Sequence, residues 1–369
     1  MSFLNQIFLI APLFLPALSL SLGILTYWAF SFYLLCFLMS IGGLFLLLAK
    51  IKIHDRSAAL FTLLPCILGI IAAYKQHHDF FLLHHALTGK SISVRGSVID
   101  IDKRNDEKFP YVITFLVDSY KTEEQIWQKI TGRIKIMTNR YKPCIVGDFI
   151  EINNIQSQSA TGDFLNYLMK ENISAYFFTG YVYHLLLSRP LISLSRFLYK
   201  KRKKLEKILQ SCANDNTIFY FNMLFLGKKE KSDEGTSTTD YFKNWGISHM
   251  TARSGMHMTI VSLLCYSLMN FFPFSFLYKQ IILGIIIVLY GLFSYPTVSF
   301  ARSFLTTIFM ILYHCVYVRS NFLYITFLVY IFQLLYNPLC LFFLDFQLSF
   351  LLTLGIGFFS KKYFYKTLI

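Results

Sequence analysis

The chain has 369 residues, of which 55% are hydrophobic and 18% aromatic, and its mean hydropathy is +0.50. Only 15% of the residues are charged, against about 25% in soluble domains, so the composition argues against an ordinary soluble domain. The net charge is +15, and outside residues 75–247 the chain carries only two acids, Asp55 and Asp345. Such a basic surplus suits anionic lipid or a polyanion such as nucleic acid, and composition does not separate the two.

The apolar runs predict a polytopic α-helical membrane protein of about eight transmembrane helices, because about 20 residues span a bilayer. The runs cover residues 7–23, 28–48, 58–74, 247–273, 280–295, 298–318, 322–336 and 341–359. They imply four parts: a three-helix membrane region (1–74), a β domain (75–182), an amphipathic helix with a polar linker (183–240), and a second membrane domain (241–369).

The β domain is predicted from alternation of apolar and polar residues, as in S-I-S-V-R-G-S-V-I-D-I-D from Ser91. Several short strands, with a turn at Gly147-Asp148, favour a small, partly open barrel that is OB-like. Such folds often bind single strands through basic and aromatic faces, although scattered basic residues also occur on any solvated surface. The DNA-binding candidates in this domain are Lys103, Arg104, Arg133, Lys135 and Arg140.

The segment after the β domain predicts a helix that lies on a membrane surface, because Arg189 and Arg196 interrupt its apolar residues. Its basic run can hold phosphates of anionic lipid or of DNA, and both alternatives stay open. The run consists of Lys200, Lys201, Arg202, Lys203 and Lys204.

Seven cysteines show no metal-ligand spacing, so no metal and no cofactor are expected. A disulfide between Cys144 and Cys212 stays open if their region is exported.

Basic loops predict the topology. The positive-inside rule places the Lys50–Arg56 loop in the cytoplasm and therefore the β domain outside. In the second membrane domain, basic residues occur in every second loop, so both termini are expected in the cytoplasm.

This topology gathers the polar side chains of the membrane helices at one external mouth, where charged groups mark function by default. They are His249, Arg253, Ser254, Gly255, His257, Arg302, Asp345, Gln347 and Ser349. We expect Asp345 to pair with Arg302 or Arg253, either within a pore or as an ion pair that only fixes helix packing.

The two histidines of this set lie eight residues apart, about 12 Å along a helix, which is too far for one metal ion. Ser254 and His257 are three residues apart, which leaves a serine nucleophile as one alternative. Ser254-Gly255 is also suited to close packing between helices.

Residues 246–257, G-I-S-H-M-T-A-R-S-G-M-H, resemble the G-x-x-H-L-L-A-I-S-G-L-H signature of the ComEC competence proteins. Ser299–Arg302 is similar to the family's S-x-x-R block, and Asn337-Pro338 with D-F-Q-L-S-F from Asp345 is similar to its N-P and F-Q-L-S-F blocks. Two departures are Arg253, where the family usually has an apolar residue, and the end at Ile369, where members continue. The chain also lacks the H-x-H-x-D-H run of a metallo-β-lactamase-like nuclease.

The resemblance implies a channel in the bacterial inner membrane that passes single-stranded transforming DNA into the cytoplasm. It implies no enzyme activity and no catalytic residues, with a competence DNA receptor, a cytoplasmic helicase and further copies of the chain as partners. The alternatives are an intramembrane serine hydrolase using Ser254 with His257, and an inactive, truncated relic of the channel.

Overall fold

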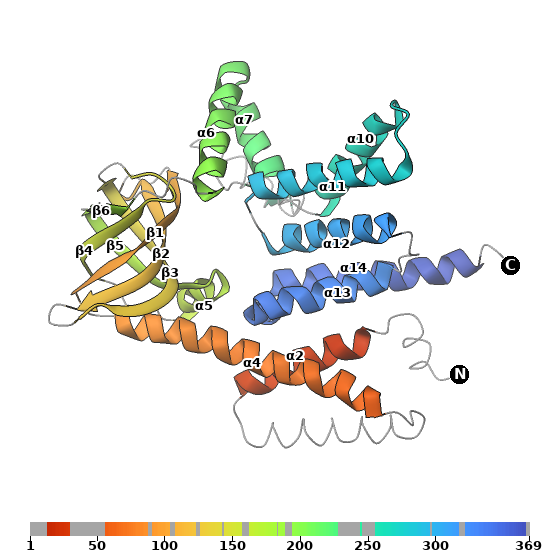
Figure 1. The fold of residues 1–369 in the computed structure, drawn as a ribbon, viewed down its shortest axis with the longest axis horizontal. Helices are drawn as coiled ribbons and strands as arrows, with labels where there is room; N and C mark the ends of the chain where they lie inside the picture. The colour runs from red at the N-terminus through yellow and green to blue at the C-terminus, as the bar shows by residue number, and fades with distance from the viewer. Residues whose placement is uncertain are drawn as a thin grey trace. The chain divides into compact units, whose positions relative to one another are not determined.

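A computed structural model describes most of the chain (Figure 1). The described residues are 13–29, 56–87, 91–103, 108–122, 126–141, 144–156, 162–182, 184–188, 194–227, 244–245, 255–295, 297–316 and 322–366. They form two compact units: the first comprises residues 1–76, 254–291 and 296–369, and the second comprises residues 77–253 and 292–295. The division falls within helix α4. The four parts that the sequence suggests stay a prediction.

The first unit is helical. It contains α2 (Phe14–Ala29), the first part of α4 (Arg56–Leu87), α10 (Gly255–Asn270), α11 (Phe276–Phe293), α12 (Val298–Cys315), α13 (Phe322–Tyr336), the 3₁₀ turn η2 (Pro338–Phe342) and α14 (Leu344–Lys366).

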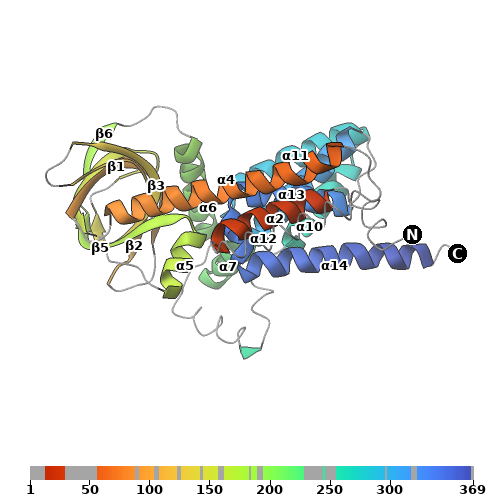
Figure 2. The ribbon, with the colours of Figure 1, turned by 90° about the horizontal axis from the view of Figure 1, so that it is seen from below.

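The helices of this unit pack through shared apolar clusters. Leu20 of α2, Val329 of α13 and Phe346 of α14 are fully or almost fully buried in one cluster. Gly23 permits the close approach of α2 to α4, because a Cβ atom there would collide with the backbone carbonyl of Cys66. The two helices accordingly lie side by side in both views (Figures 1 and 2).

The predicted fold class is wrong in its number of membrane spans. Within the described residues, only α11 and α12, with 18 residues each, are long and apolar enough to cross a membrane. α13 covers the whole apolar run at 322–336, yet its 15 residues give a length of only roughly 22 Å, against a hydrocarbon thickness of about 30 Å. The run at 28–48 lies almost wholly outside the described residues.

The multi-pass arrangement and the cytoplasmic termini depended on that span count, and the described residues do not support them. Residues 1–12 and 367–369 lie outside the described part of the chain.

The second unit contains a six-stranded sheet in the order β5-β3-β2-β1-β4-β6. Its strands are β1 (Ser91–Lys103), β2 (Tyr111–Thr122), β3 (Gln128–Tyr141), β4 (Phe149–Gln156), β5 (Ile173–Val182) and β6 (His184–Ser188). All neighbours are antiparallel except β3 and β5, which run parallel.

The sheet folds around one apolar core. Ile92 and Val94 of β1 are buried, and they share a cluster with Ile150 of β4 and Phe177 of β5. Residues from both sides of the strand order therefore meet, which requires the sheet to curve. The expected turn before β4 is present, with Gly147 at φ 87°, a conformation that favours glycine.

Helices complete this unit: the end of α4, α5 (Gly162–Lys170), α6 (Leu194–Cys212), α7 (Asp215–Phe221) and the π-helix η1 (Asn222–Leu226). Leu83 and Leu87 at the end of α4 are fully buried in the core of the sheet. Figures 1 and 2 both show this end of α4 along the sheet.

Candidate functional site

A polar cluster in the first unit centres on Arg302 of α12. Its Nε donates a hydrogen bond to Ser349 Oγ at 2.7 Å, and its Nη1 donates to Thr353 Oγ1. Ser349 and Thr353 are four residues apart on α14 and therefore lie on one face of that helix. Phe350, between them in sequence, has its ring centroid 5.8 Å from the guanidinium carbon. The guanidinium is thus held in a fixed orientation by two hydroxyls.

The Arg302 guanidinium keeps donor capacity beyond these two bonds, because arginine has five N–H groups. Among the described residues, Nη2 has no hydrogen-bond acceptor. This group faces the start of α10, since a Cβ atom on Gly255 would lie 3.6 Å from Nη2. The same Cβ atom would lie 2.8 Å from Ser303 Oγ, so glycine at 255 allows α10 to begin close to α12.

The partners of Arg302 in the structure are not the acid that we expected. Within the described residues, its guanidinium bonds to hydroxyls and not to Asp345. Asp345 lies in the first turn of α14, where the partial positive charge of the helix N-terminus favours a carboxylate. Gln347 donates from Nε2 to the backbone carbonyl of Leu341 at 2.8 Å.

Part of the predicted site falls outside the described residues. His249, Arg253 and Ser254 are in this group, and Ser254 is also the serine of the alternative hydrolase. His257 lies in the first turn of α10, two residues after Gly255, and is half-buried. The structure therefore brings together Gly255, Arg302 and Ser349, while the functional roles of all nine residues stay predictions.

The structure describes the side chains of three of the five basic candidates in the β domain. Arg133 and Arg140 of β3 are exposed, and Lys135 lies between them, half-buried, with its Nζ 6.0 Å from the Tyr167 ring centroid. Lys103 ends β1 and its side chain is not described, and Arg104 is outside the described residues.

The basic run lies on α6 and divides into two sets. Lys200, Lys201 and Lys204 are exposed. Arg202 instead donates from Nη2 to the Leu292 carbonyl at 2.6 Å, and Lys203 pairs with Glu206 at 2.7 Å.

The charges of Arg202 and Lys203 also influence the carboxyl group of Asp100 on β1. Burial and then the neighbouring Asp102 raise the pKa of the Asp100 carboxyl, and the charges of Arg202 and Lys203 partly offset that rise. Lys203 is exposed as well, but its ammonium pairs with Glu206, so Lys200, Lys201 and Lys204 are the lysines of the run that are available to an external phosphate.

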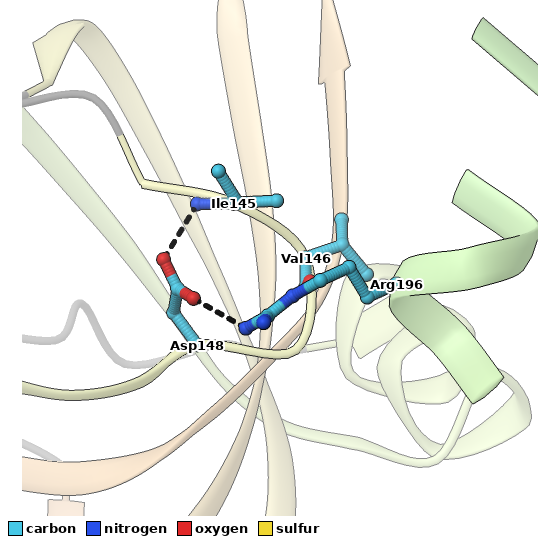
Figure 3. Close-up of polar contacts among 4 residues, drawn as sticks. All are labelled: Ile145, Val146, Asp148 and Arg196. Carbon is cyan, nitrogen blue, oxygen red and sulfur yellow. Dashed lines mark hydrogen bonds and ion pairs between the residues drawn. The ribbon is translucent and has the colours of Figure 1, made fainter. Parts of the chain in front are cut away.

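An ion pair that the sequence did not indicate joins α6 to the sheet (Figure 3). Arg196 Nη2 donates to Asp148 Oδ1 at 2.6 Å, and the other carboxylate oxygen accepts from the Ile145 N–H at 3.0 Å. The Asp148 side chain is completely buried and that of Arg196 is 13% exposed. The pair fixes the start of α6 on the turn before β4. Nothing in the sequence around Arg196 identified its partner 48 positions earlier.

Neither cysteine of the proposed disulfide is bonded in the structure. Cys144 is buried and Cys212 is exposed, and both are free thiols. Burial, and then the Asp148 carboxylate, raise the pKa of the Cys144 thiol to about 11. Thr353 is a further residue that sequence reasoning missed; its only signal was its position four residues after Ser349.

Comparison with known proteins gives one match. Residues 224–367 match the family model described as Competence protein, and this region contains Gly255, Arg302, Ser349 and Thr353. No curated protein and no solved structure matches the chain. The match agrees with the resemblance recognised in the sequence: residues 224–367 are similar to the competence protein family.

Proposed function

We propose that this protein is a membrane subunit that passes single-stranded DNA into the cytoplasm of a bacterium during natural competence. The family match supports a role in DNA uptake during competence. The translocation role and the single-stranded form of the DNA are our inferences from the residues of the cluster.

The observation that carries the proposal is the Arg302 guanidinium, which Ser349 and Thr353 fix in place. Arg302 lies on α12, one of two helices among the described residues that are long and apolar enough to cross a membrane. An arginine at membrane depth is costly and faces a wet or protein-lined interior. A guanidinium with two donors bound and others free can donate to a phosphate oxygen. In this proposal Arg302 contacts successive phosphates of the passing strand.

The second unit supports the same function. A β1-β2-β3 meander, β4 on the far side of β1 and β5 parallel to β3 resemble an oligonucleotide-binding barrel. We propose that Arg133 and Arg140, together with Lys200, Lys201 and Lys204, attract the phosphates of DNA or of anionic lipid headgroups. A DNA receptor, a cytoplasmic helicase and further copies of the chain are the partners that this role requires.

The test replaces Arg302 in cells and measures internalised, nuclease-protected fluorescent DNA. We expect Arg302→Ala to lower uptake by about tenfold or more, since a charge-assisted hydrogen bond contributes about 1.5–3 kcal/mol and successive phosphates use the same group. Arg302→Lys keeps the charge but loses the fork of donors, so it should retain part of the uptake.

Lys279→Gln is the matched control, because Lys279 is a cation of the same unit whose ammonium bonds to Asn270 at 3.0 Å, outside the cluster. It should take up DNA normally. Membrane fractionation and immunoblotting must show equal amounts of all variants. Normal uptake by Arg302→Ala at equal protein level would contradict the proposal.

A further inference from the structure

The second unit contains a polar hollow on the face of the sheet opposite its core. Along β1, Ile92 and Val94 are buried inside, so Ser91, Ser93 and Arg95 point to the other face. There they line a hollow of about 370 Å³ together with residues of β2, of β4 and of the segment before β3. Binding pockets for small ligands begin at about 300 Å³, so the hollow suits a group of the size of one nucleotide or one sugar.

One wall of the hollow is a stacked pair. The Arg95 guanidinium carbon lies 3.8 Å from the centroid of the Trp127 ring. Arg95 Nε also donates to Glu151 Oε2 at 2.8 Å, and these two residues are directly opposite each other on β1 and β4. The guanidinium therefore lies over the indole ring, and its charge is balanced by the carboxylate. Together they offer a planar surface for stacking.

The hollow also carries a charge that the stacked pair does not balance. Lys121 of β2 also lines it and is the cross-strand partner of Ser93. Within the described residues its ammonium has no hydrogen-bond or ion-pair partner. With Arg95 and Glu151 neutralising each other, the described lining residues of the hollow carry one net positive charge beside a planar surface.

We propose that this hollow binds one nucleotide of single-stranded DNA, with the base stacked on the Arg95–Trp127 pair and a phosphate at Lys121. A neutral sugar would also stack on an indole, but it leaves the Lys121 charge without a counterpart. Asn153 and Ser93 supply an amide and a hydroxyl for the base edge or the deoxyribose. The proposal rests on the proposed function for its ligand and adds a specific binding position to it.

The test uses the full chain in detergent and a fluorescein-labelled oligothymidylate, with the affinity measured by anisotropy at several salt concentrations. Trp127→Ala should bind the oligonucleotide at least about fivefold more weakly, because it loses the stacking of one base. Lys121→Gln should weaken it and lower the slope of log affinity against log salt by about 0.7. The matched controls are Ile126→Ala, beside Trp127 and 88% exposed, and Lys129→Gln, an exposed lysine of β3 outside the hollow.

Each outcome separates this proposal from the proposed function. If Trp127→Ala and Lys121→Gln bind the oligonucleotide as tightly as the wild type, the hollow is not a nucleotide site. This result would leave the proposed function untouched, because the Arg302 variants test that function by DNA uptake. Equal weakening by Lys129→Gln and Lys121→Gln would also overturn the hollow as a nucleotide site, because the effect would then be general charge. Quenching of Trp127 fluorescence by chitotetraose and not by oligothymidylate, in a chain lacking the other two tryptophans, would assign the hollow to a glycan instead. Circular dichroism spectra and melting temperatures matching the wild type exclude misfolding as the cause of weaker binding.

Discussion

The contact of Gly255 with Ser303 shows how a single missing side chain sets the spacing of two helices. Ser303 Oγ donates to the Ser299 carbonyl at 2.9 Å, so it is held where a Cβ atom on residue 255 would lie 2.8 Å away. A clash of this size forces either the hydroxyl or the start of α10 to move. Helix propensity acts in the other direction, because alanine is favoured over glycine by up to about 1 kcal/mol in helix interiors.

We therefore predict that the effect of a substitution at Gly255 on stability depends on whether residue 303 carries a hydroxyl. Removal of the hydroxyl by Ser303→Ala leaves its Cβ 3.7 Å from the built Cβ atom of residue 255, an ordinary contact. We expect Gly255→Ala to lower the melting temperature in the Ser303 background and to be neutral or stabilising in Ser303→Ala. The coupling free energy should be about 1 kcal/mol. Additive melting-temperature shifts in the four proteins would refute this account.

At the scale of elements, the Asp148–Arg196 pair decides where the basic helix α6 begins on the sheet. Because Asp148 is completely buried, loss of its partner leaves an uncompensated charge, which costs about 3–5 kcal/mol. Removal of both charges is far less costly. The pair therefore helps to hold the exposed lysines of α6 in their place on the sheet.

We expect Arg196→Met to lower stability and to raise hydrogen exchange of the first turns of α6, as measured by mass spectrometry of the intact chain. Asp148→Asn with Arg196→Met should recover most of the loss. The control is Arg140→Met, which removes an exposed arginine of the same unit. Exchange in α6 that is unchanged by Arg196→Met would mean that other contacts hold the helix.

For the whole molecule, the sequence predicted the β unit far better than the helical one. Strict alternation over 91–102 located β1, and Gly147 located a turn, because both features are encoded within a few residues. Helix ends were less accessible: α4 continues to Leu87, well past the apolar run at 58–74, because a hydropathy run carries no information on where helical hydrogen bonding stops. The partners of Arg302 and Arg196 were missed because tertiary contacts across 47 or more positions leave no local pattern.

The two long apolar helices lead to a topological prediction. If α11 and α12 cross a membrane as a hairpin, Ser275 before α11 lies on one side and Val298 at the start of α12 on the other. In a cysteine-free chain, an impermeant maleimide added to intact cells should label only one of Ser275→Cys and Val298→Cys. Both should react after permeabilisation. Labelling of both positions from outside would show that the pair does not span.

The edge strand β6 affects how self-association of the protein should be interpreted. β6 ends the strand order, and its Leu185, Leu186 and Leu187 are 60%, 43% and 39% exposed. Among the described strands β6 pairs only with β4, and an apolar edge strand is a template on which a strand from another molecule can pair. A shortened version of the protein that keeps this unit would therefore form dimers or aggregates through its edge. Oligomers of such a fragment would therefore reflect pairing at this exposed edge strand and not an assembly of the whole chain.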